Sequence, residues 1–181
     1  MEIEKTLIKD CFLIKPRVFE DDRGYFFESF NDKLFKSKTG LTSDFVQDNE
    51  SYSKYGVIRG LHAQSGNFAQ AKLVRVIEGE VLDVVVDFRP DSDTYLQHLT
   101  FLLTEENKHQ VYVPKGCLHG FSVLSKNARF FYKCDNFYNK ESEIGFRYDD
   151  PQFNIDWKIQ VNDRIISPKD LDIPFFNKKI S

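Results

Sequence analysis

Short segments that alternate between apolar and polar residues dominate the central part of the chain. Clusters of Gly, Pro, Asn and Ser separate these segments at intervals of about 8–12 residues, which is typical of strands joined by turns. Many short strands at this spacing, with few helices, indicate a β-sandwich or a β-barrel. The strands predicted in this way span residues 45–48, 57–63, 72–77, 80–88, 99–103, 110–113, 118–124 and 128–134.

The region before residue 45 combines strand and helix signals. An apolar run at 11–19 is broken by Pro16, which favours an edge strand, and a turn at 21–24 precedes a further strand at 25–28. Asn31 and Gly40 delimit a short helix as its N-cap and its C-terminal glycine. We expect Leu34 and Phe35 to face the core from this helix.

A second helix start is predicted near the end of the chain. Ser167 is a suitable N-cap, Pro168 fits the first turn, and Asp170 stands where a capping box requires an acceptor.

Four predicted strands each carry one polar residue on an otherwise apolar face. Because side chains alternate between the two faces of a strand, Lys72, Tyr132, His119 and His62 each share a face with apolar neighbours. Strands that each direct one polar group into a common interior indicate a ligand cavity.

Arg59 has the opposite parity to His62 in the same predicted strand. If both side chains reach one ligand, the strand must kink or bulge between them, and Gly60 is suited to that position.

Composition excludes several classes of protein. The 181 residues are 41% hydrophobic and 15% aromatic, which suits one domain spanning 1–181 with a β-rich core. The net charge of −3 argues against nucleic-acid and membrane-surface binding. A charged N-terminus, an odd number of cysteines (three) and the lack of a long apolar run predict a cytoplasmic location, without a membrane span.

We also expect no bound metal. Many jelly rolls hold a metal with two His residues two positions apart, but Gln64 occupies the second position after His62. His98 and His109 lie in segments with a surface pattern, and His119 by itself cannot complete a ligand set.

The chain resembles the dTDP-4-dehydrorhamnose 3,5-epimerase family from about Phe19 to Pro174. The resemblance rests on ordered blocks at residues 22–28, 45–49, 56–62, 70–76, 114–121, 132–134, 150–151, 155–157 and 167–170. It implies a double-stranded β-helix (a cupin-type jelly roll), a homodimer, and activity without a metal or an organic cofactor. It also implies a nucleotide-diphosphate-linked 4-keto-6-deoxy sugar, on a dTDP or GDP carrier, as the substrate.

The same resemblance implies a proton-transfer reaction at C3, at C5 or at both. His62 matches the base, Asp170 the carboxylate that orients it, Tyr132 the acid on the opposite face, and Lys72 the cation beside the enolate oxygen. These roles agree with the ordinary chemistry of the four side chains.

The remaining positions implied by the resemblance bind the substrate. Arg23 and Arg59 match diphosphate contacts. The further binding positions are Phe26, Glu28, Gln47, Asn49, His119, Tyr138, Glu143 and Lys169. A partner subunit would supply some of these, Phe26 and Glu28 especially. We add the hypothesis that Asp83, a lone acid in an apolar strand, hydrogen-bonds His119.

Two departures from the family pattern concern the sugar. Ala63 stands where the family usually has Tyr, and the loop at 65–69 lacks the common Pro. We expect both changes to lie beside the sugar. A smaller side chain there would admit a larger sugar, such as a heptose.

Two other functions are compatible with the same residues. A sugar-nucleotide 3,4-ketoisomerase would use a similar base, although such relatives tend to carry a second His where this chain has Gln64. A non-catalytic protein that binds nucleotide sugars would not need Tyr132 and Asp170 to converge on His62.

Overall fold

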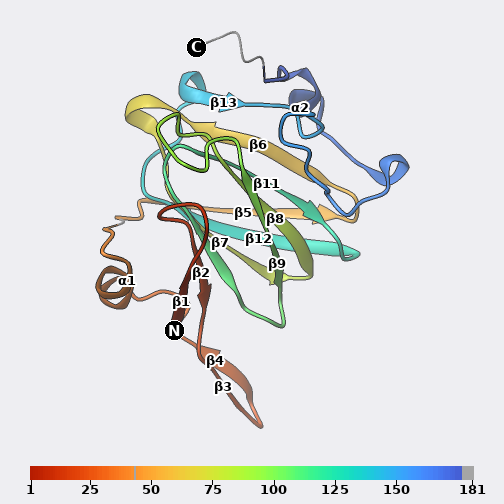
Figure 1. The fold of residues 1–181 in the computed structure, drawn as a ribbon. Helices are drawn as coiled ribbons and strands as arrows, with labels where there is room; N and C mark the ends of the chain where they lie inside the picture. Colours follow the sequence, from red (N-terminus) through yellow and green to blue (C-terminus); the bar gives the residue numbers. More distant parts are fainter. Residues whose placement is uncertain (43, 177–181) are drawn as a thin grey trace.

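Two antiparallel β-sheets lie face to face in the computed structural model, which describes residues 1–42 and 44–176 (Figure 1). The larger sheet has the order β1 (Glu2–Lys5), β2 (Phe12–Lys15), β10 (Gln110–Val113), β7 (Lys72–Glu78), β12 (Asn127–Cys134) and β5 (Gln47–Lys54). The smaller sheet has the order β13 (Glu143–Gly145), β6 (Ile58–Gln64), β11 (Cys117–Val123), β8 (Glu80–Asp87) and β9 (His98–Thr104). This arrangement is the predicted jelly roll, and the fold class is confirmed.

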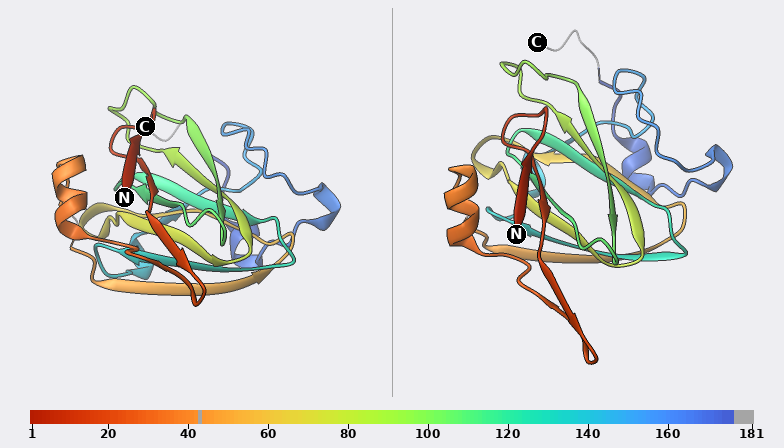
Figure 2. Two further views of the ribbon diagram at one scale, coloured as in Figure 1. Left: turned by 90° about the horizontal axis from the view of Figure 1, so that it is seen from below. Right: turned by 60° about the horizontal axis from the view of Figure 1, so that its bottom comes forward.

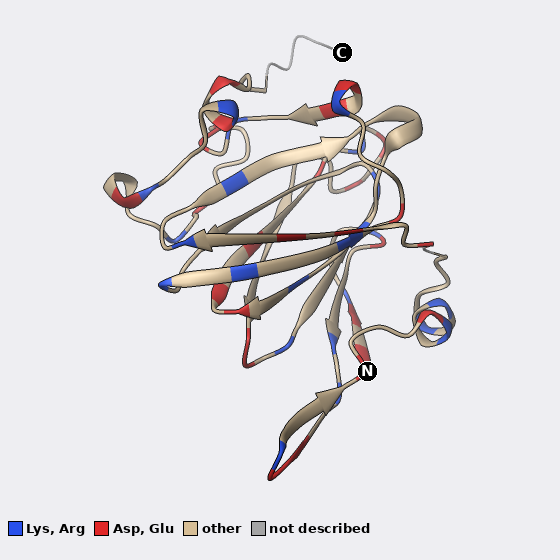
Figure 3. Cartoon of the chain, turned by 180° about the vertical axis from the view of Figure 1, so that it is seen from behind, with Lys and Arg blue, Asp and Glu red and all other residues tan. Residues whose placement is uncertain are grey.

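Helices are few within the described residues. They comprise α1 (Asp32–Thr39), α2 (Pro168–Asp172) and the 3-10 turns η1 (Gly66–Phe68), η2 (Lys140–Ser142) and η3 (Val161–Asp163). None of the described helices has the length and apolar character that crossing a membrane requires. Charges of both signs are scattered over the elements and are not gathered on one face (Figure 3).

A separate hairpin projects from the body of the molecule. Among the described strands, β3 (Val18–Asp21) and β4 (Gly24–Phe27) pair only with each other. Figures 1 and 2 show the hairpin extending away from both sheets. Its aromatic side chains remain accessible: Phe19 is 51% exposed, Tyr25 56% and Phe26 70%.

The core between the sheets consists of inward-facing aliphatic and aromatic side chains. Val74 and Phe130 from the larger sheet meet Val85, Phe121 and other residues of the smaller sheet. The Phe121 and Phe130 rings stack with centroids 4.2 Å apart, which joins the two layers directly. This packing holds the sheets at the separation within which polar side chains can line a cavity.

The central strands β8 and β11 of the smaller sheet are buried on both faces. The C-terminal coil packs Phe153 and Trp157 against the outer side of the sheet, where Val84, Val86 and Leu118 are buried. Strands β8 and β11 therefore carry apolar side chains on both faces, because a strand covered on both sides has no solvent face.

The strand predictions between residues 57 and 134 were accurate to within about two residues. The run at 11–19, expected as one strand, forms two strands, β2 and β3, on either side of Pro16. The strand expected at 45–48 runs instead over Gln47–Lys54, and the short strands β1 and β13 were not predicted. Polar sequence obscured these elements, since β5 exposes alternate residues along much of its length.

Two details near the N-terminus were wrong. The strand that precedes Pro16 is not at an edge, because β1 pairs on its outer side and β10 on its inner side. Asn31 and Gly40 delimit α1 as predicted, and Phe35 is fully buried, but Leu34 is 37% exposed. A helix of two turns packs only a narrow stripe against the sheet, and Leu34 lies beside that stripe.

The predicted bulge at Gly60 is confirmed by the strand register. His62 pairs with His119 and Arg59 with Phe121, so β6 contains one residue more than β11 between these two points. Gly60 has φ +115°, and a Cβ added there would lie 2.7 Å from both Gly120 Cα and His119 O. Glycine is therefore required by conformation and by space.

We expect Gly60→Ala to destabilise the protein by about 2–4 kcal/mol, because strain at positive φ adds to the backbone overlap. The matched control is Gly40→Ala, at φ +75° with no atom within 4 Å of the added Cβ, which should cost about 1 kcal/mol. Thermal unfolding measures both. Equal melting temperatures for the two variants would contradict the steric argument.

Candidate active site

A cavity of about 350 Å³ opens between the sheets, and its walls come from five strands and from α2. The lining residues are Asn49, Glu50, Ser51, Arg59, His62, Lys72, His119, Gly120, Phe121, Phe130, Tyr132, Ser167, Lys169 and Asp170. A second chamber of about 290 Å³ shares His62, Lys72 and Tyr132 with it. The four polar residues predicted from strand alternation therefore do meet in one interior.

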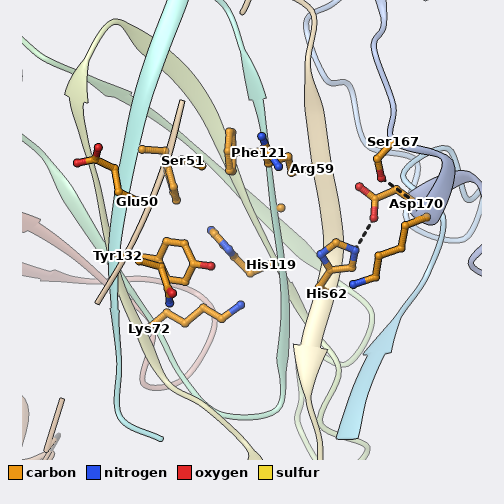
Figure 4. A pocket seen from close by; sticks show the side chains of 14 residues that line it. Glu50, Ser51, Arg59, His62, Lys72, His119, Phe121, Tyr132, Ser167 and Asp170 are labelled. Atoms are coloured by element: carbon orange, nitrogen blue, oxygen red, sulfur yellow. Dashed lines mark hydrogen bonds and ion pairs between the residues drawn. The ribbon is translucent and has the colours of Figure 1, made fainter. Parts of the chain in front are cut away.

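His62 and Asp170 form a close pair on one side of the cavity. His62 Nε2 lies 2.7 Å from Asp170 Oδ1, and the other ring nitrogen faces the cavity (Figure 4). Burial raises the pKa of Asp170, but hydrogen bonds from His62, Ser167 and the backbone of Gly60 outweigh it, so the net pKa is lowered. An ionised Asp170 holds the proton on Nε2 and leaves the lone pair of Nδ1 available as a base.

Ser167 and Asp170 show how the second helix serves the site. The Ser167 side chain accepts a hydrogen bond from the Asp170 N–H, as an N-cap does. The Asp170 carboxylate binds His62 from the first turn of α2. The cap thus fixes the carboxylate that orients the histidine.

Lys72 and Tyr132 face His62 from the opposite side of the cavity (Figure 4). The Lys72 ammonium lies 5.8 Å from the centroid of the Tyr132 ring. Burial lowers the pKa of Lys72 and raises the pKa of Tyr132, because both charged forms lose water. Burial therefore favours the protonated phenol of Tyr132, and an anionic ligand oxygen would be a favourable partner for the Lys72 ammonium, because it would offset the lost water.

Arg59 enters the same cavity because of the bulge. Its guanidinium donates to Ser53 Oγ at 3.1 and 3.2 Å and has no carboxylate partner among the described residues. A guanidinium held by a neutral hydroxyl keeps its charge available for phosphate oxygens.

His119 forms the predicted hydrogen bond with Asp83. His119 Nε2 lies 2.7 Å from Asp83 Oδ2, and both side chains are buried. The hypothesis that the two residues hydrogen-bond is confirmed. The ring also stacks on Phe130 at 6.0 Å, so His119 is fixed in the cavity wall from two directions.

Glu143, Tyr138 and Lys169 form a polar cluster beside the second chamber. Tyr138 donates to Glu143 at 2.8 Å, and the Lys169 ammonium is paired with the same carboxylate. Burial raises the pKa of Glu143, but these two hydrogen bonds outweigh it and the net pKa is lowered. Gln47 and Asn49 adjoin this cluster and hydrogen-bond each other at 3.1 Å.

Three predicted binding residues lie away from the cavity of their own chain. Arg23 and Phe26 belong to the projecting hairpin, and Glu28 follows it; all three are exposed. Arg23 is paired with Asp21 at 2.6 Å, as its sequence context suggests for a surface turn. Within one chain, these residues line neither chamber.

The cavity includes residues that the sequence did not suggest. Ser51 was hidden in a polar stretch whose strand was placed too early, and strand parity with Asn49 is the signal that could have found it. Ser53, in the same strand, accepts the hydrogen bonds of the Arg59 guanidinium. Gln64 and Gln70 are buried at 6% and 8% exposure and line the second chamber. Gln64 lies two positions after His62, the candidate base, and this spacing is the signal that could have identified it as a residue of the site.

Ala63 borders the second chamber, but its side chain also packs in the apolar cluster outside the cavity. It is 7% exposed and belongs to the apolar cluster on the outer face of the smaller sheet. Its side chain therefore contributes to the packing of β6 as well as to the wall beside the candidate base.

The fold and the site together define a cupin-type jelly roll whose cavity places the His62–Asp170 pair opposite Tyr132 and the buried Lys72. Comparison with known proteins gives the family. The family described as dTDP-4-dehydrorhamnose 3,5-epimerase matches residues 5–178, and the chain belongs to it.

Similar proteins agree in sequence and in fold. A dTDP-4-dehydrorhamnose 3,5-epimerase of Escherichia coli (strain K12) is 48% identical over 170 residues, covering 94% of this chain and 91% of that protein. The crystal structure of the enzyme of that name from Elizabethkingia anophelis NUHP1 is 54% identical, with a TM-score of 0.95, covering 100% and 99% of the two chains.

A third relative was crystallised with a ligand. The dTDP-6-deoxy-D-glucose-3,5-epimerase of Legionella pneumophila Philadelphia 1, in complex with dTDP-4-keto-L-rhamnose, is 46% identical, with a TM-score of 0.92, covering 96% and 92% of the two chains. The prediction of an epimerase that acts on a nucleotide-linked 4-keto-6-deoxy sugar is confirmed at the level of the family.

Proposed function

We propose that the protein inverts both C3 and C5 of a dTDP-linked 4-keto-6-deoxyhexose. The observation that carries this proposal is the His62–Asp170 pair facing Tyr132 across one cavity, with Lys72 beside the phenol. The dTDP carrier and the two centres are supported by the relatives, which are named 3,5-epimerases and include one bound to dTDP-4-keto-L-rhamnose.

The mechanism follows from the positions of these groups. The C4 ketone acidifies the hydrogens on C3 and C5, and Nδ1 of His62 removes one of them as a proton. The electrons move onto the ketone oxygen, and the resulting enolate lies against the buried Lys72 ammonium, which stabilises its negative charge. Tyr132 then protonates the same carbon from the opposite face, which inverts it.

Each cycle ends with both catalytic groups restored. The proton taken by His62 is released to solvent, and the Tyr132 phenolate recovers a proton from solvent, so the net change is a change of configuration. Repetition at the second carbon gives the doubly inverted sugar. The raised pKa of Tyr132 suits this role, since a phenol that stays protonated can act as the acid.

Two features disfavour the alternative functions. The convergence of Asp170, Tyr132 and Lys72 on His62 is not required of a protein that only binds nucleotide sugars. For a ketoisomerase, the position two residues after His62 would be expected to carry a second His, but Gln64 there accepts a hydrogen bond from the backbone of Asn139.

We propose further that the protein is a homodimer in which each hairpin reaches the partner's cavity. A two-stranded hairpin is marginally stable alone, and this one exposes Phe19 and Phe26. Burial of these rings on a second copy would bring Arg23 and Glu28 with them. The three unpaired, buried cysteines suit a reducing compartment, so we place the enzyme in the cytoplasm.

Deuterium incorporation tests the reaction. In heavy water, the wild type should exchange the hydrogens on C3 and C5 of a dTDP-4-keto-6-deoxyhexose, and His62→Ala should lower this exchange by about 10²–10⁴-fold. Tyr132→Phe should retain exchange but complete inversion poorly, because the proton then returns to the face from which it left. His109→Ala, whose histidine lines neither chamber, is the control. Lack of exchange by the wild type with dTDP- and GDP-4-keto sugars would refute the proposal.

The pH dependence of exchange tests the role of Lys72. Because its pKa is lowered from 10.5, the ammonium loses its proton, and kcat/KM falls, at a lower pH than for an ordinary lysine. The pKa of Tyr132 is raised, so Tyr132→Phe should leave this alkaline fall in place, whereas Lys72→Arg should shift it to higher pH. An alkaline fall that disappears in Tyr132→Phe would contradict the assignment.

Mixing of inactive variants tests the shared site. A variant with Arg23, Phe26 and Glu28 all changed to Ala, and the His62→Ala variant, should each be inactive alone. Co-expressed, they should recover about a quarter of wild-type activity, because half of the dimers are mixed and each mixed dimer has one complete site. Full activity of the hairpin variant alone, or no recovery on mixing two folded variants, would contradict the proposal.

A further inference from the structure

The second chamber contains two buried amides that the reaction does not use. It adjoins His62, Lys72 and Tyr132, and Gln64 and Gln70 form part of its wall. The chain between these two glutamines turns through η1, so both side chains meet the same loop, at residues 136–139. The loop fixes how each amide is oriented.

The side-chain carbonyl of Gln64 accepts a hydrogen bond from that loop. Its Oε1 accepts a hydrogen bond from the backbone N–H of Asn139 at 2.8 Å, and a backbone N–H can only donate. The orientation of the amide is therefore settled by chemistry. Its Nε2 has no hydrogen-bond partner among the described residues, although Gln64 is only 6% exposed.

Gln70 bonds to the same loop through its amide nitrogen, whereas Gln64 uses its amide oxygen. Its Nε2 donates to the backbone carbonyl of Asn136 at 2.8 Å, and a carbonyl can only accept. The Oε1 atom has no partner in the described part of the chain, and the residue is 8% exposed. The chamber wall thus carries one free donor, on Gln64, and one free acceptor, on Gln70.

A donor and an acceptor on one wall select the chemistry of the ligand. A ligand that fills the chamber excludes solvent from both atoms, and leaving either of them unpaired then costs about 1–3 kcal/mol. A ligand that satisfies both therefore binds preferentially. A hydroxyl accepts and donates at once, whereas a ketone only accepts and a methylene does neither. The chamber adjoins the reacting groups, where the sugar ring would lie.

We propose that Gln64 and Gln70 bind a ring hydroxyl of the sugar and make the enzyme selective for substrates that retain it. The inference rests on the proposed function. A 4-keto-6-deoxyhexose linked through C1 has hydroxyls on C2 and C3 only, so the recognised group is one of these two. The two glutamines are specificity determinants and take no proton from the sugar.

The test compares kcat/KM for deuterium exchange on a dTDP-4-keto-6-deoxyhexose with that on its 2-deoxy and 3-deoxy analogues. The wild type should discriminate against one analogue by at least about tenfold, because that analogue leaves both amide atoms unpaired. Gln64→Glu keeps the acceptor for Asn139 and removes the donor, and Gln70→Met removes the acceptor. Each should bring the ratio to within about threefold of unity.

The ratio separates recognition from a structural role. Loss of loop packing, or the added charge in Gln64→Glu, would lower kcat/KM on all substrates alike and leave the ratio unchanged. Gln64→Met repeats the test without the charge, and Gln152→Met, at an exposed position outside both chambers, should keep the wild-type ratio.

Equal use of all three sugars by the wild type, or an unchanged ratio in active Gln64 and Gln70 variants, would overturn the inference while leaving the proposed function intact. Absence of exchange on the parent sugar would overturn the proposed function, and the inference with it.

Discussion

The extra residue in β6 is the constraint on which the cavity depends. Without it, Arg59 and His62 would point to opposite faces of the smaller sheet, because side chains alternate along a strand. With it, Arg59, the candidate for phosphate binding, and His62, the candidate base, line one interior. Only glycine fits at residue 60, since both its φ and the closeness of β11 exclude a side chain. A single backbone irregularity therefore determines which side chains the ligand meets.

Desolvation then sets the properties of the groups that the bulge and the sheets bring together. The same burial that lowers the pKa of Lys72 raises the pKa of Tyr132, so an available ammonium and a protonated phenol lie side by side. Asp170 behaves differently, because hydrogen bonds to its carboxylate outweigh the loss of water. One shared environment thus shifts the pKa values of these three groups in different directions, which suits the roles proposed for them.

Much of the fold and of the site could be predicted because the relevant signals are local. Period-2 alternation located most of the central strands, and single polar residues on apolar faces identified Lys72, Tyr132, His62 and His119. The strand β5 was misplaced because its sequence, at the edge of a sheet, is polar throughout. The burial of β8 on both faces was missed because the covering segment, around Phe153 and Trp157, is about 70 residues distant in sequence.

The sequence by itself determined the jelly roll, the family and the residue types that can transfer a proton, since these depend on periodicity, turn residues and ordered motifs. The tertiary structure decided which of these residues meet. Asp170 hydrogen-bonds His62 across 108 positions of the chain, and Asp83 hydrogen-bonds His119. The loop at 136–139 orients the amides of Gln64 and Gln70. The physical reason is that a hydrogen bond requires its two atoms to approach within about 3 Å, and only the packing of the two sheets and the C-terminal segment brings such distant residues that close.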